Sequence, residues 1–148
     1  MRVLSAQFNY HIIDFENNTK KVLTLLQEQG NEVDLIVFSP LCLSGYYPFD
    51  LILEPNFIEI QNQHLALIQQ QTKHYKAAVV LSYIEKNNGP GKPFYHSLGV
   101  FERGNRLISY HQKKFSSENF WGENRLFEPG KLPGTFIFQN KIIGILCI

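Results

Sequence analysis

The chain has 148 residues, a formal net charge of +1 and a hydrophobic content of 44%. This length suits one domain, residues 1–148, that buries a core without needing disulfides or metals. The near-neutral charge gives no electrostatic reason to expect binding to nucleic acid or to an anionic membrane. No apolar run approaches the ~20 residues of a membrane span. We therefore expect a cytoplasmic location and two reduced cysteines, Cys42 and Cys147.

The first half of the sequence alternates between apolar runs typical of buried strands and segments with one apolar helical face. We expect strands over residues 3–8, 35–38 and 77–83, and helices around residues 22–26 and 57–75. A polar stretch that begins at Asp14 can cap the first helix, and Gly30 is a candidate for the left-handed residue that follows it. This β-α-β-α-β order predicts a parallel sheet covered by helices, which is an α/β fold.

The second half has the pattern of hairpins around one long loop. We expect strands over residues 94–101 and 106–110, and a last pair over residues 136–138 and 142–148. The loop over residues 111–133 has little periodicity, but it is too aromatic for simple disorder. The final apolar run has no strand after it, so we expect more chain or another subunit to complete the layer.

Three segments resemble, in the correct order, the nitrilase (carbon–nitrogen hydrolase) superfamily, and most closely the glutaminase domains of glutamine-dependent NAD synthetases. The segments are RVLSAQFNYHIIDFENNTKKV, DLIVFSPLCLSGYYPFDLIL and YHQKKFSSENFWGENRLFEPG. A fourth segment, IIGILCI, lies where that family has the pattern GVxICED. The resemblance implies an α/β, nitrilase-like α-β-β-α sandwich, of which this chain covers roughly the first half.

The resemblance also implies a Cys–Glu–Lys triad for amide hydrolysis. In that chemistry the thiolate attacks the carboxamide carbon to form a thioester, the carboxylate transfers protons, and the ammonium stabilises the oxyanion. At the corresponding positions this sequence has Pro40 for the acid, Gln112 for the lysine and Ile148 for the cysteine. Proline and isoleucine side chains offer no donor or acceptor, and an amide carries no charge. All three roles are therefore vacant.

A displaced triad is the alternative, because Cys147 precedes the nucleophile position by one residue and Lys113 follows the lysine position by one. A slip of one residue in a strand turns a side chain to the opposite face of the sheet, which argues against Cys147. A lysine in a loop reaches a pocket more easily. Asp50 and Glu54 lie beyond the turn, so we expect no acid to replace Pro40. We favour the degenerate triad.

Four further side chains are candidates to line the pocket, because they match or lie near the family's pocket positions: Tyr46, Glu123, Arg125 and Trp121. For Glu123 and Arg125 the alternative is an exposed ion pair with little energetic weight. His96 stands where the family often has asparagine, and we expect a buried, hydrogen-bonded core residue. The histidines lack metal-ligand spacing and no phosphate-binding loop is present, so we expect neither metal nor cofactor.

These features predict a catalytically inactive relative of the glutaminase domain with a structural or partner-binding role. Its partners would be a second copy in a homo-oligomer, or a missing second half or partner chain. One alternative is an active amidase that uses Cys147 and Lys113 with additional chain. The other is a small-ligand binding module that keeps the pocket, with a small amide as the ligand.

Overall fold

The computed structural model describes residues 1–112 and 123–145, which form seven strands and two long helices with three shorter helical segments. In chain order the elements are β1 (Val3–Ala6), α1 (Phe15–Gln29), β2 (Leu35–Phe38), η1 (Phe49–Leu53), α2 (Phe57–Gln71), η2 (Thr72–His74), β3 (Ala78–Lys86), β4 (Phe94–Glu102), β5 (Asn105–His111), α3 (Glu123–Leu126), β6 (Thr135–Phe138) and β7 (Lys141–Gly144).

The main sheet has five strands in the order β1-β2-β3-β4-β5. β1, β2 and β3 are parallel, and β3, β4 and β5 are antiparallel. The parallel part follows from the two βαβ crossovers, because parallel neighbours need a long connection that a helix supplies. Within the antiparallel part, a tight turn joins β4 to β5, and its residues Arg103 and Gly104 have positive φ angles of 50° and 81°. The predicted α/β fold is confirmed.

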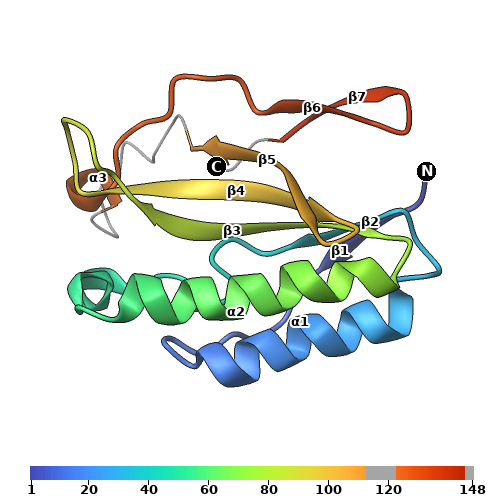
Figure 1. Cartoon of the computed structure of the whole chain (residues 1–148). Helices are drawn as coiled ribbons and strands as arrows, with labels where there is room; N and C mark the ends of the chain where they lie inside the picture. The colour runs from blue at the N-terminus through green and yellow to red at the C-terminus, as the bar shows by residue number, and fades with distance from the viewer. Residues whose placement is uncertain (113–122, 146–148) are drawn as a thin grey trace.

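The elements stack in three layers (Figure 1). Helices α1 and α2 pack side by side on one face of the main sheet, and the β6–β7 hairpin lies over the other face. The larger core fills the space between helices and sheet, with Val22, Leu26 and Ile68 fully buried. A smaller core joins the sheet to the hairpin through Val80, Val100, Phe136 and their neighbours. Such a sheet, covered on both faces, explains the continuous apolar runs in β2 and β3.

Helix α1 begins as the sequence predicts and ends differently. The Asp14 carboxylate accepts the Asn17 backbone N–H at 3.3 Å, which caps the first turn. Gly30 follows the helix, but its φ of −62° is right-handed, so the predicted left-handed cap is wrong. A Cβ at this position would lie 2.8 Å from the Tyr75 ring. Glycine is therefore needed there for close packing and not for its backbone conformation.

Other boundaries shift by a few residues. β1 ends at Ala6 rather than at residue 8, and β3 continues to Lys86. The predicted loop over residues 111–133 contains α3, and Phe127 forms a parallel bridge with Phe94 at the end of β4. The predicted last strand begins one residue earlier and is described only as far as Gly144. No helix formed by the described residues is long and apolar enough to cross a membrane.

Candidate functional site

A cavity of about 460 Å³ lies where β2 and β5 end. It gathers residues from both ends of the sequence, because Pro40 follows β2, Gln112 follows β5 and Glu123 begins α3. Its walls consist of Phe8, Asn9, Tyr10, Ser39, Pro40, Tyr46, His96, Gln112 and Glu123. Four residues singled out by the sequence, Pro40, Gln112, Tyr46 and Glu123, therefore meet in one place.

The turn after β2 holds Pro40 at the cavity wall. The Ser39 hydroxyl donates to the Ala6 carbonyl at 3.3 Å, which ties the turn to β1. The Leu41 N–H donates to the Ser82 hydroxyl at 2.6 Å, which ties it to β3. Leu41 itself has a φ of +50°, so the chain bends sharply just after the proline. The side chain placed here can neither accept nor donate a proton.

Gln112 is fixed in the opposite wall by its backbone and its side chain. Its N–H donates to the His96 carbonyl at 2.7 Å, and its carbonyl accepts the Gly130 N–H at 2.8 Å. Its side-chain Oε1 is hydrogen-bonded to Nδ1 of His96. Because an amide oxygen only accepts, Nδ1 carries the ring hydrogen and Nε2 is left with a lone pair. The side chain at the family's lysine position is thus a neutral partner of a histidine.

His96 is buried, as the sequence predicts, but its hydrogen bonding is incomplete. Only 1% of the residue is exposed, and Nε2 makes no hydrogen bond with any part of the chain that the structure describes. Burial lowers the pKa of His96 to about 4, although its bond to Gln112 opposes the shift. The ring is therefore neutral at pH 7, and this residue of the cavity wall keeps a buried, unused acceptor. The expectation of a fully satisfied core residue is wrong for this nitrogen.

Glu123 brings a carboxylate into the same cavity. Its side chain accepts a hydrogen bond of 2.8 Å from the Tyr46 hydroxyl, and only 9% of the residue is exposed. Tyr46 itself is half exposed and joins the cavity wall from the turn after β2. Glu123, one of the side chains that the sequence marked as a pocket candidate, thus lines the cavity, although it lies 83 positions further along the chain than Pro40.

Arg125 lies apart from this cavity. Its guanidinium pairs with the Asp50 carboxylate, and its side chain is 61% exposed. Arg125 is not among the residues that line the cavity, contrary to the sequence prediction. The predicted exposed pair with Glu123 is also wrong, because each residue has another partner. The predicted positions Lys113, Trp121, Cys147 and Ile148 lie outside the described residues.

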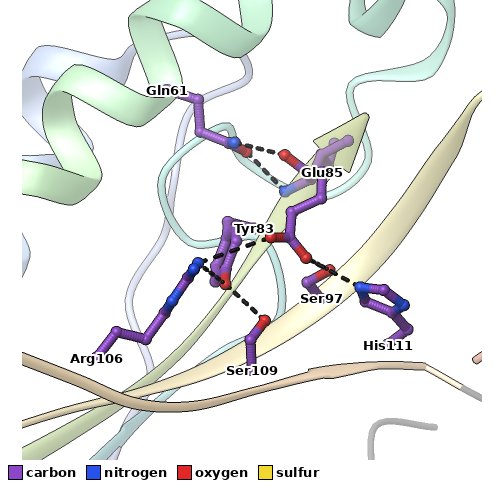
Figure 2. Close-up of polar contacts among 8 residues, drawn as sticks. Gln61, Tyr83, Glu85, Ser97, Arg106, Ser109 and His111 are labelled. Atoms are coloured by element: carbon purple, nitrogen blue, oxygen red, sulfur yellow. Dashed lines mark hydrogen bonds and ion pairs between the residues drawn. The ribbon is translucent and has the colours of Figure 1, made fainter. Parts of the chain in front are cut away.

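A second polar cluster on the opposite face of the sheet holds the end of β5 (Figure 2). The Glu85 carboxylate accepts a 2.5 Å hydrogen bond from Ser97 and lies 3.1 Å from Nε2 of His111. The His111 ring also stacks on Tyr95, with 3.8 Å between ring centroids. Since side chains alternate along a strand, anchoring His111 on this face turns the next residue, Gln112, toward the cavity.

Cys42 cannot serve as a nucleophile in this cavity. It is fully buried in the core, it is free, and it does not line the cavity walls. Burial raises the pKa of its thiol to about 12, so the thiolate is scarce at neutral pH. No group of three or more metal-binding side chains occurs within residues 1–112 and 123–145.

The fold and cavity agree with the comparison to known families. Residues 2–146 match the carbon-nitrogen hydrolase family, and the chain belongs to that family. Similar curated proteins are glutamine-dependent NAD(+) synthetases: that of Aquifex aeolicus is 32% identical over 130 residues, and that of Thermotoga maritima is 31% identical over 134. These matches cover 86% and 88% of this chain, but the chain spans about a quarter of the length of such relatives, 22% in both cases.

Solved structures give the same result. The chain resembles glutamine-dependent NAD+ synthetase from Acinetobacter baumannii with a TM-score of 0.81 and 26% identity, over 98% of this chain and 27% of that one. An amidase from Nesterenkonia sp. shares the fold with a TM-score of 0.77 and 20% identity, over 99% of this chain and 54% of that one. The described layers therefore correspond to the first half of the nitrilase fold.

His96 is the site residue whose role the sequence left undefined. A signal was available, because His96 and Gln112 lie on neighbouring strands predicted to be antiparallel, one residue beyond the Ser97–His111 pair. Their side chains therefore share one face of the sheet. The observed register, which includes an irregularity between Val100 and Phe101, places the two side chains next to each other.

Proposed function

We propose that this chain is a catalytically inactive carbon–nitrogen hydrolase domain related to the glutaminase of NAD synthetases. One observation carries this proposal: Pro40 and Gln112 line the same cavity. The resemblance assigns to these positions the proton-transferring acid and the cation that stabilises the oxyanion. Proline and glutamine can perform neither role.

The size of the expected loss supports inactivity over reduced activity. Removing an oxyanion-stabilising group alone costs roughly 10² to 10³ in rate. Removing a nucleophile lowers the rate by roughly 10⁶, and removing the acid and the cation as well lowers it little further. A site that has lost its nucleophile therefore has no further use for the other two groups. The joint replacement at positions 40, 112 and 148 fits such a site.

The second candidate function is an active amidase with a displaced triad. Glu123 favours it, because this carboxylate lies in the cavity and its hydroxyl partner, Tyr46, holds it in place. In this alternative Glu123 would act as the base, Cys147 as the nucleophile and Lys113 as the oxyanion partner. The proton would pass from the thiol to the carboxylate, and the amide nitrogen would leave as ammonia.

The partner-binding role that we propose for the domain rests on the outer face of the β6–β7 hairpin. Ile137 and Ile142 are cross-strand neighbours and are 74% and 80% exposed. Leu132, just before β6, is also largely exposed. Exposed aliphatic side chains grouped in this way are typical of surfaces that contact another chain. Light scattering of the wild type and of a double variant, Ile137→Lys and Ile142→Lys, tests whether that partner is a second copy.

Ammonia release from glutamine and from butyramide tests the absence of catalysis. We expect the wild type and the Cys147→Ala variant to give the same background rate at equal protein concentration. An active amidase of this family, assayed in parallel, shows that the conditions support turnover. Release by the wild type that disappears in Cys147→Ala would overturn the proposal and establish the displaced triad.

A further inference from the structure

Among its described lining residues the cavity has a carboxylate and no lysine or arginine. Glu123 is its carboxylate, and the hydrogen bond that it receives comes from a neutral hydroxyl, that of Tyr46. The residue at the family's lysine position, Gln112, is neutral and is turned to His96. A carboxylate that is only 9% exposed is poorly solvated, and it gains from a positive charge brought into the same cavity.

The cavity also has a second, unused acceptor. Nε2 of His96 has a lone pair, because Gln112 fixes the ring hydrogen on Nδ1, and it makes no hydrogen bond with the described residues. A buried polar atom without a partner carries a desolvation penalty, which a bound donor group removes. The low pKa of His96 is consistent with this neutral, accepting form. Glu123 and Nε2 of His96 both call for N–H or O–H donors. The Tyr10 hydroxyl in the same walls also makes no hydrogen bond with the described residues, and it can accept as well as donate.

We propose that this cavity binds a small primary amine in its ammonium form. The ligand's ammonium group forms an ion pair with Glu123 and donates a hydrogen bond to Nε2 of His96. Its apolar part lies against Phe8 and Pro40, which belong to the same walls. This inference rests on the proposed function in one respect: Gln112 leaves no ammonium group at the lysine position, and the ligand supplies one.

The chemistry distinguishes an ammonium ligand from the alternatives. An ammonium group has three donors and a positive charge, which match two acceptors of which one is a carboxylate. A carboxamide could place its carbonyl on the Tyr10 hydroxyl, but it brings no positive charge to Glu123. A carboxylate ligand would place like charges together beside Glu123. The volume of about 460 Å³ lies within the usual range for small-molecule sites.

The test uses three probes of similar size at pH 7: n-butylammonium, butyramide and butyrate. Each is titrated into the isotope-labelled full chain, and binding is followed by NMR through the side-chain ¹⁵N signals of His96. We expect butylammonium to bind at least tenfold more tightly than butyramide, with a shift of the Nε2 signal on binding. Butyrate should not bind. Equal or tighter binding of butyramide, or no binding of butylammonium, would overturn the proposal.

Two variants identify the contact. Glu123→Gln keeps the shape of the side chain and removes its charge, so we expect butylammonium affinity to fall at least tenfold while butyramide affinity is unchanged. Glu32→Gln, at an exposed position away from the cavity, is the matched control and should bind like the wild type. Unchanged butylammonium binding in Glu123→Gln would refute the ion pair. Should Glu123→Gln not fold, the Nε2 shift and probe ranking of the wild type decide alone.

The readouts of this proposal and of the proposed function are independent. Ammonia release measures hydrolysis and is indifferent to butylammonium. An active enzyme without amine binding would refute both proposals, whereas an inactive protein without amine binding would refute only the ammonium site.

Discussion

The buried histidine in the cavity wall predicts a specific dependence of stability on pH. His96 has a pKa of about 4 in the folded chain, because burial disfavours its charged form, whereas an exposed histidine has a pKa near 6.5. Between these pH values the unfolded chain binds a proton that the folded chain does not. The free energy of unfolding therefore rises with pH through this window, and its full value is present above pH 6.5.

The magnitude follows from the two pKa values. Between pH 8 and pH 5 we expect His96 to lower the free energy of unfolding by about 2 kcal/mol. Asp34 acts outside this window: hydrogen bonds from Lys76 and from further partners hold its pKa well below the usual range, so its contribution is lost only as the pH falls below about 4. A variant that lacks only His96 isolates its contribution within this window.

The assay is urea denaturation at pH 8, 6.5 and 5, comparing the wild type with His96→Asn. Asparagine at this position does not titrate. Between pH 8 and pH 5 the free energy of unfolding should therefore fall by about 2 kcal/mol less in the variant than in the wild type. His74→Asn, at an exposed histidine, is the control and should follow the wild type. An equal fall in the free energy of unfolding in the wild type and in His96→Asn would refute the reasoning.

Three further predictions concern the framework around the cavity. Gln61 is fully buried and exchanges two hydrogen bonds with the backbone of Ile84. Gln61→Leu should therefore lower the free energy of unfolding, measured by urea denaturation, by about 2 to 4 kcal/mol. A decrease below about 1 kcal/mol would contradict this account. Gly45 has a φ of +74° and a Cβ there would lie 2.7 Å from the His11 carbonyl oxygen, so Gly45→Ala should cost about 2 kcal/mol or more; an unchanged urea midpoint would exclude such crowding. Cys42 should resist iodoacetamide in the native state, because it is buried and its pKa is about 12; peptide mass spectrometry showing alkylation as fast as in urea would disprove it.

The layered core could be predicted from the sequence because hydrophobic periodicity determines it. β2 has the predicted bounds, since an apolar run between a charged residue and a proline leaves little freedom. The four-residue helix α3 was missed, because a single turn shows no periodicity and depends on the tertiary contact of Phe127 with β4. Gly30 shows a similar limit, since its role depends on Tyr75, which is distant in the sequence.

The site was predictable in part, for a different reason. Pro40, Gln112, Tyr46 and Glu123 were found through resemblance to a family, and the folded chain brings them together. What the sequence could not supply was the pairing of side chains, which decides their chemistry. The amide at position 112 is turned to a histidine, and this contact leaves one nitrogen with an unused lone pair. Strand register, rather than composition, determines such a contact.

Intact-mass spectrometry of the protein mixed with glutamine and quenched in acid tests the central claim most directly. A working nucleophile of this family accumulates a thioester, whereas a cavity that only binds forms no covalent bond. We predict that the wild-type mass is unchanged at every mixing time and equals that expected from the sequence. A glutamyl adduct that maps to Cys147 and is absent from Cys147→Ala would contradict this account.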